Sequence, residues 1–80
     1  MPIVSYILIN IASGKDREVF EKVIKMRQVK EAVLVYGECD LILKVEVKSF
    51  DELDTLIFDT LRPINGVECT KTLIGTKKLK

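Results

Sequence analysis

The segment Leu41 to Val47, "LILKVEV", constrains the fold more than any other part of the chain. Large apolar residues occupy every second position of it: Leu41, Leu43, Val45 and Val47. The positions between them are occupied by Ile42, Lys44 and Glu46. This period of two is typical of a β-strand that buries one face and leaves the other more polar. The segment therefore predicts a sheet with a covering layer on one side.

Three further segments read as strands of the same sheet. Ile3 to Ala12 is apolar at both odd and even positions, which is typical of a central strand. Val29 to Tyr36 has valines in phase and is broken by Gly37, and the short gap before Leu41 predicts a hairpin. Val67 to Ile74 follows the turn pair Asn65-Gly66 and is rich in β-branched residues, so it predicts the last strand.

Two helices are predicted between these strands. The first covers roughly residues 15–26, where apolar residues recur at helical spacing after a Ser13-to-Asp16 capping signature. The second follows a capping box from Ser49 to Glu52 and ends at Pro63, because the residue before proline disfavours helical geometry. Its expected buried stripe is Phe50, Leu53, Leu56, Ile57 and Leu61.

The order β-α-β-β-α-β predicts an α+β fold of the ferredoxin-like sandwich type, as one domain over residues 1–80. Right-handed crossovers place both helices on one face of a four-stranded antiparallel sheet. If the even positions of the first strand face away from the helices, Tyr6 and Leu8 lie beside Ile42 on the open face. Such a patch predicts a homodimer of the α/β-barrel type, with Tyr6, Leu8 and Ile42 in its interface. Scattered surface apolar residues are the alternative.

Composition excludes several classes of function. The chain has no histidine, so histidine-based catalysis and metal binding are excluded, and we expect no catalytic residue, metal or cofactor. Cys39 and Cys69 stand apart and favour a reduced compartment. The net charge of +1 gives no overall attraction for nucleic acid. With no long apolar run and no signal-peptide pattern, we expect a cytoplasmic protein that does not bind membranes.

Two motifs carry a resemblance to a known family. In "VYGECDLILKV" the pattern is Gly-x-x-Asp between apolar strands, formed by Gly37 and Asp40. In "GVECTKTLI" the matching residues are Gly66, Val67, Thr70, Thr72 and Ile74. Together they resemble the RAM domain, the effector-binding and assembly domain of Lrp/AsnC-type transcription regulators. Cys39 departs from the pattern, since an aromatic residue is common there, and this affects the expected ligand preference.

The resemblance implies a small-molecule effector, typically an amino acid, held between dimers of a ring-like assembly. An octamer or another ring of dimers is then expected beyond the dimer. Asp40 would accept the ligand's ammonium, and backbone N–H groups from Gly37 to Cys39 would bind its carboxylate. Hydroxyls of a neighbouring subunit would complete the site, whose predicted residues are Tyr36, Gly37, Glu38, Cys39, Asp40, Thr70 and Thr72. The same residues also fit a plain hairpin turn and ordinary β-forming threonines.

The first strand begins by Ile3, which leaves no room for the helix-turn-helix domain of such regulators. We therefore expect a stand-alone RAM domain that does not bind DNA directly and tunes transcription by co-assembly with full-length regulators. Two alternatives stay open. The first is a pure oligomerisation module without a ligand, and the second is a small ferredoxin-like dimeric enzyme.

Overall fold

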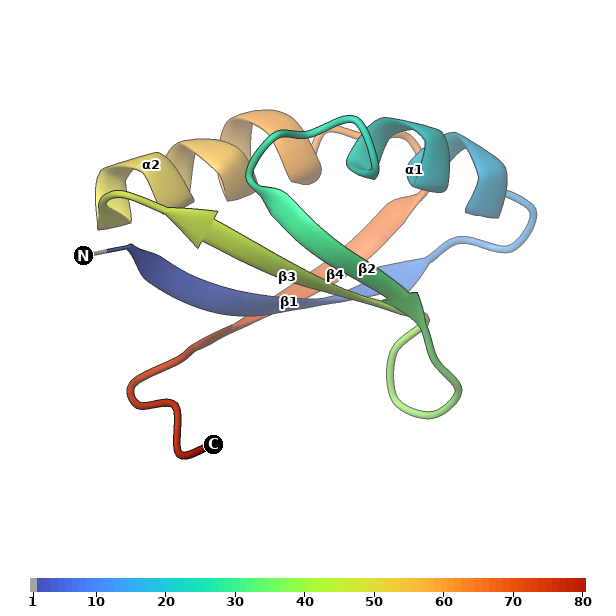
Figure 1. The fold of residues 1–80 in the computed structure, drawn as a ribbon. Coiled ribbons are helices and arrows are strands. Elements are labelled where there is room, and N and C mark those ends of the chain that lie inside the picture. The colour runs from blue at the N-terminus through green and yellow to red at the C-terminus, as the bar shows by residue number, and fades with distance from the viewer. Residues whose placement is uncertain (1) are drawn as a thin grey trace.

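The computed structural model describes residues 2–80 as a four-stranded antiparallel sheet with a helical layer on one face (Figure 1). The elements follow the predicted order: β1 (Ile3–Ile11), α1 (Asp16–Val23), β2 (Val29–Leu34), β3 (Leu41–Val47), α2 (Phe50–Thr55), a π-helical segment η1 (Leu56–Leu61) and β4 (Val67–Ile74). The ferredoxin-like α+β sandwich predicted from the sequence is therefore confirmed.

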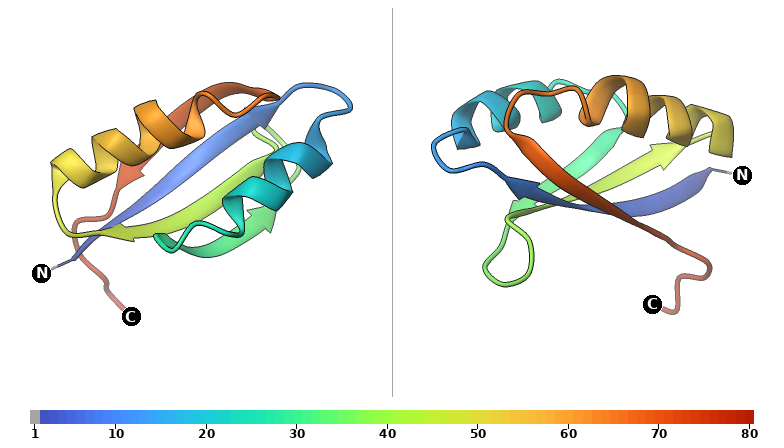
Figure 2. Two further views of the ribbon diagram at one scale, coloured as in Figure 1. Left: turned by 90° about the horizontal axis from the view of Figure 1, so that it is seen from above. Right: turned by 180° about the vertical axis from the view of Figure 1, so that it is seen from behind.

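The strands lie in the order β2-β3-β1-β4, with β1 and β3 at the centre. The view from above shows α1 over the β2–β3 half and the α2–η1 helix over the β1–β4 half (Figure 2). The residues of β1 and β3 that face this layer are almost fully buried, and Ile7, Ile9, Leu43 and Val45 are each 0% exposed. The period of two in β3 thus marks the core face, as the sequence predicted.

The second capping box forms as predicted, whereas the first does not. The Glu52 N–H donates to Oγ of Ser49 at 3.1 Å, and Oε1 of Glu52 accepts from the Lys48 N–H at 2.7 Å. At α1 the cap position falls on Lys15, and no side chain caps the helix. The chain turns through Gly14 at a φ of +81°, which displaces Ser13 from the helix start. The helix also ends at Val23, earlier than the predicted limit.

Phe50 was predicted on the buried stripe of the second helix, and this was wrong. It is 57% exposed, because the first residue of α2 has helical neighbours on one side only. The other stripe residues, Leu53, Leu56, Ile57 and Leu61, are buried. Leu56 and Leu61 reach the core although they are five positions apart, since η1 winds more widely than an α-helix and the Arg62 N–H donates to the Ile57 carbonyl.

Gly66 joins the helical layer to β4 at a point where only glycine fits. Its φ is +107°, and a Cβ there would lie 2.5 Å from the Cβ of Lys15 and 3.1 Å from Cγ2 of Val19. The start of β4 can therefore pack closely against the start of α1.

Candidate functional site

The β2–β3 hairpin projects past the end of the sheet and is fastened to β1 (Figure 1). The Asp40 N–H donates to the Ile9 carbonyl at 2.9 Å, and Nδ2 of Asn10 donates to the Glu38 carbonyl at 2.9 Å. The Ile11 N–H donates to Oδ2 of Asp40 at 2.8 Å. The loop is thus held by two strands, β3 along the chain and β1 through hydrogen bonds.

Asp40 therefore has a role that neither sequence interpretation included. Its carboxylate binds the backbone of β1 and not that of its own turn, so its position is set by a third element. Within residues 2–80, Oδ1 of Asp40 makes no hydrogen bond to another residue. A carboxylate with one oxygen fixed and the other open is suited to accept a cationic donor.

Gly37 is the residue that lets the loop turn. Its φ of +124° lies in a region that residues with a side chain rarely adopt, although a Cβ at this position would meet open space. Tyr36 before it is fully exposed, and Cys39 after it is buried at 7% exposure. The loop thus presents an aromatic ring outward and packs its thiol inward.

A hollow of about 410 Å³ lies beside the hairpin. It is bounded by the end of β1, the first half of α1, the end of β2 and the hairpin itself. Its lining residues are Ile11, Asp16, Phe20, Leu34, Val35, Tyr36 and Asp40. Its size falls in the range of about 300–1,000 Å³ that is usual for small-molecule sites.

The structure brings only some of the predicted ligand residues to this hollow. Tyr36 and Asp40 line it, whereas Gly37, Glu38 and Cys39 belong to the same loop without lining it. Thr70 and Thr72 lie on β4, where they pair with Ile9 and Ile7 of β1. β4 is the edge strand on the side of the sheet opposite β2. In one chain the two threonines therefore lie apart from the hairpin, and their part in a site stays a prediction that needs a neighbouring subunit.

Sequence reasoning did not identify five of the lining residues, which are Ile11, Asp16, Phe20, Leu34 and Val35. Asp16 was assigned to a capping signature, and the other four belong to the apolar pattern of the predicted strands and helix. No local pattern distinguishes these residues from ordinary cap and strand or helix positions. The packing of α1 against the sheet and the pairing of β1 with the hairpin segment bring them together.

The uncovered face of the sheet carries the apolar residues predicted for it. Leu8 pairs with Ile42 across β1 and β3, and Tyr6 pairs with Lys44, so all lie on the face opposite the core residues. Tyr6 is 40% exposed, and the strands at the two edges add Val33 and Leu73, which are also exposed. The even positions of β1 therefore face away from the helices, which is the condition on which the predicted patch depended, and the interface role of these residues stays a prediction.

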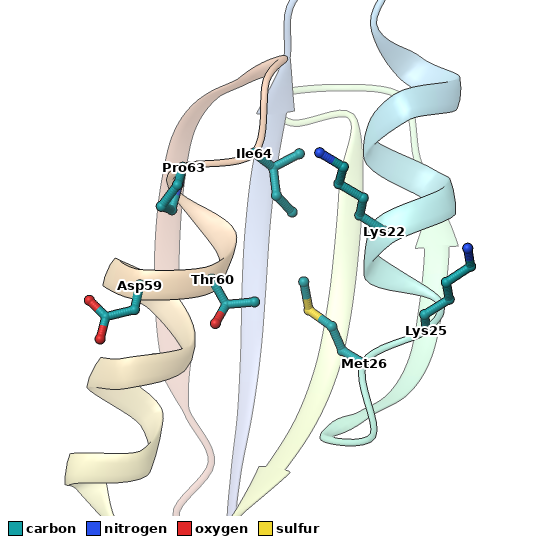
Figure 3. Close-up of a pocket in the computed structure, with 7 residues that line it drawn as sticks. All are labelled: Lys22, Lys25, Met26, Asp59, Thr60, Pro63 and Ile64. Atoms are coloured by element: carbon teal, nitrogen blue, oxygen red, sulfur yellow. The ribbon is translucent and has the colours of Figure 1, made fainter.

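A second concave surface, the groove between the helices, lies between α1 and η1 on the outer side of the helical layer (Figure 3). Met26 and Ile64 approach it from opposite sides, Lys22 extends toward it, and Asp59 points away from it. None of the residues predicted for the ligand site lines this groove.

Residues 2–80 contain no cluster of acidic, cysteine and histidine side chains able to hold a metal ion, and Cys39 and Cys69 are free thiols. None of the described helices has the length and apolar character that crossing a membrane requires.

Comparison with known proteins identifies relatives whose match covers nearly all of this chain. Residues 4–80 match the family model described as the Lrp/AsnC ligand binding domain. The HTH-type transcriptional regulator FL11 of Pyrococcus furiosus is 35% identical over 75 residues, which cover 94% of this chain and 49% of the regulator. The chain spans about half the length of the curated relatives it matches.

Solved structures show the same architecture. FFRP-DM1 is 43% identical with a TM-score of 0.88, and the match covers 92% of this chain and 99% of FFRP-DM1. The regulator NMB0573 of Neisseria meningitidis, solved as an L-Met complex, has a TM-score of 0.93 over 98% of this chain and 52% of its own. At 22% identity the second likeness shows the fold alone.

Proposed function

The chain belongs to the Lrp/AsnC ligand-binding domain family, and on this basis we propose that it is a non-enzymatic module that binds a free amino acid and assembles with copies of itself. The curated relatives are named as transcriptional regulators, so the module would serve transcription regulation. The ligand would bind at the β2–β3 hairpin, in the hollow that Asp40 lines.

The observation that carries the ligand proposal is the position of Asp40. The Ile11 N–H fixes one of its carboxylate oxygens at the edge of the hollow, and the other oxygen can accept from the ammonium of an amino acid. A charge-assisted hydrogen bond to a group that is already held in place loses little conformational entropy on binding. The backbone N–H groups from Gly37 to Cys39, in the loop that adjoins the hollow, would bind the ligand's carboxylate, as the family resemblance implies. The L-Met complex of NMB0573 is an amino-acid complex of the same fold.

The assembly proposal rests on the open face of the sheet. Tyr6, Leu8 and Ile42 form the centre of an apolar surface that the helices do not cover. Packing of two such faces would remove this surface from water and give a dimer of the α/β-barrel type. A ring of such dimers, an octamer among them, would bring Thr70 and Thr72 of one subunit toward the hairpin of another.

We further propose an indirect effect on transcription. The chain would act in the cytoplasm by joining the assemblies of full-length regulators and altering their response to the amino acid. No direct contact with nucleic acid is proposed, because a net charge of +1 gives the chain no overall attraction for it.

Titration calorimetry with a panel of free amino acids tests the ligand proposal, with Asp40→Asn as the informative variant. The asparagine carbonyl can still accept from the Ile11 N–H, so the hairpin stays fastened while the negative charge is lost. We expect the variant to bind at least about tenfold more weakly, the loss of roughly 1.4 kcal/mol that one charge-assisted hydrogen bond explains.

The matched control is Asp59→Asn, which removes an exposed carboxylate on η1 and should leave the affinity unchanged. Equal affinity of wild type and Asp40→Asn would contradict the role of Asp40. No heat with any amino acid, together with an assembled mass in light scattering, would favour the pure oligomerisation module instead.

A further inference from the structure

We infer that the amino acid bound beside the hairpin has an apolar side chain, an inference that rests on the proposed function and specifies its ligand class. It follows from the chemistry of the hollow of about 410 Å³ at the hairpin. The side chains that line this hollow belong to β1, α1, the end of β2 and the hairpin.

The walls of the hollow are mainly apolar. Ile11, Phe20, Leu34 and Val35 contribute aliphatic or aromatic surface, and the ring of Tyr36 stands at the edge. Leu34 is 61% exposed although it is a large apolar side chain, and Phe20 and Val35 are only half-buried. A ligand side chain that covers this surface would remove apolar area of both molecules from water.

The charges of the hollow disfavour an acidic ligand. Its two ionisable lining groups other than Tyr36 are the carboxylates of Asp16 and Asp40, and no lysine or arginine of residues 2–80 lines it. Glu38 adds a third negative charge in the adjoining loop. The side-chain carboxylate of glutamate or aspartate would find repulsion and no cationic partner.

The geometry also disfavours a basic ligand. Asp40 is committed to the α-ammonium in the proposed binding mode, so a second ammonium would have only Asp16 as its partner. Asp16 and Asp40 are both exposed, but the Ile11 N–H holds the carboxylate of Asp40, whereas no hydrogen bond within residues 2–80 holds that of Asp16, so an ion pair with Asp16 gains little in water. The ligand's charged side-chain end would meanwhile displace contact with the apolar wall.

The groove between the helices supplies a comparison within the same molecule. Its charged lining residues are Lys22, Lys25 and Asp59, and Lys22 is the one that extends toward the apolar side chains of Met26 and Ile64 (Figure 3). The groove therefore combines apolar surface with more positive than negative charge. The hollow at the hairpin combines apolar surface with negative charge only. Selection against acidic ligands is therefore a property of the hairpin site and not of every concave surface of the protein.

The test compares ligands by titration calorimetry on the intact chain. Leucine, glutamate and lysine share the α-ammonium and α-carboxylate and differ in the side chain. We expect leucine to bind at least about tenfold more tightly than glutamate or lysine, the ratio that burial of an aliphatic side chain supplies. Equal or tighter binding of glutamate or lysine would overturn the inference and leave the proposed function standing. If no amino acid binds, the ligand part of the proposed function fails and the inference falls with it.

A variant pair locates the apolar wall. Leu34→Thr keeps a β-forming residue at an exposed position of β2 and removes apolar surface from the hollow. We expect it to weaken leucine binding about five- to tenfold and to change alanine binding much less, because alanine barely reaches the wall. Ile24→Thr, at 65% exposure and outside the hollow, is the matched control and should leave leucine affinity unchanged. An unchanged affinity for leucine in Leu34→Thr, with a native circular dichroism spectrum, would overturn the inference.

Discussion

The two faces of the sheet are built by the same four strands but differ in what they bury. On the face under the helices, Ile7, Ile9, Leu43 and Val45 are fully buried. On the opposite face their sequence neighbours are a mixture of apolar and charged residues, among which Tyr6 is 40% exposed and Lys44 forms an ion pair with Glu31 at 3.6 Å.

This difference separates two functions of one sheet. The covered face contributes the hydrophobic free energy that folds the chain, and its residues need only be apolar and of fitting volume. The open face contributes little to the fold of a single chain, yet it keeps large apolar residues that water disfavours. We therefore assign the covered face to stability and the open face to assembly, and the predictions below test this division in decreasing order of effect.

Truncation of Leu43 and of its neighbour Ile42 compares the faces directly. Leu43→Ala leaves a cavity in the core and should lower the free energy of unfolding by about 2–5 kcal/mol. Ile42→Ala, on the open face, should lower the free energy of unfolding by less than about 1 kcal/mol in dilute solution. At high protein concentration, where copies associate, the free energy of unfolding should fall by more. Urea unfolding over a series of protein concentrations measures both. Equal losses at every concentration would contradict the division between the faces.

A charge on the open face should separate assembly from folding. Leu8→Glu places a carboxylate beside Lys71, its partner on β4, so the single chain tolerates it. Between two packed faces the same carboxylate would lose its water, and we expect association to weaken about a hundredfold, or roughly 2.7 kcal/mol. Light scattering should then give the mass of one chain with a native circular dichroism spectrum.

The control places the same charge elsewhere. Ile24→Glu, at an exposed position that follows α1, should leave the assembled mass unchanged. A wild-type protein that scatters as one chain at micromolar concentration would remove the assembly proposal altogether.

Within residues 2–80, Ser5 is the one buried residue of the covered face with a polar side chain, and it tests how strictly apolar that face is. It is 0% exposed, and among the described residues its Oγ has no hydrogen-bond partner. A buried hydroxyl without a partner loses its hydration with no compensation. Ser5→Ala should therefore stabilise the protein by about 1 kcal/mol, measured by thermal unfolding. A destabilised variant would mean that the hydroxyl finds a partner in the folded protein, and the covered face would then not be purely hydrophobic.

The covered face was predictable from sequence because it follows from local periodicity. The alternation in β3 and the odd positions of β1 needed no knowledge of distant residues, and the topology followed from the order of the elements. The predictions for Ser13 and Phe50 were wrong for a different reason. Each matches a helical motif, but the turn through Gly14 and the exposed first turn of α2 decide whether the motif is used.

The candidate site was predictable only in part. Gly37 and Asp40 belong to a motif within one loop, and in the structure Gly37 turns that loop with a positive φ of +124°. The bond from the Ile11 N–H to Asp40 joins residues 29 positions apart. Phe20 and Leu34 line the same hollow from a helix and an edge strand, and no sequence pattern records that they lie near each other. Sequence thus identified Tyr36 and Asp40 among the lining residues of the candidate site, and the packing of β1, β2 and α1 added the rest.

The smallest predicted effect concerns the cap that holds the helical layer over the covered face. The Lys48 N–H that donates to Glu52 holds the pKa of this carboxyl below its ordinary value of 4.5, although desolvation opposes the shift, and Arg27 adds a favourable charge at 3.8 Å. A lowered folded-state pKa means that the ionised group stabilises the fold above its unfolded pKa, and that this contribution is lost as the pH falls through the folded pKa. Glu52→Gln should therefore lower Tm slightly at neutral pH and make no difference in acid below the lowered pKa. Asp54→Asn, which changes an exposed carboxylate of the same helix, serves as the control. If Glu52→Gln still lowers Tm in acid, the cap stabilises the helix through its hydrogen bond and not through the charge of Glu52.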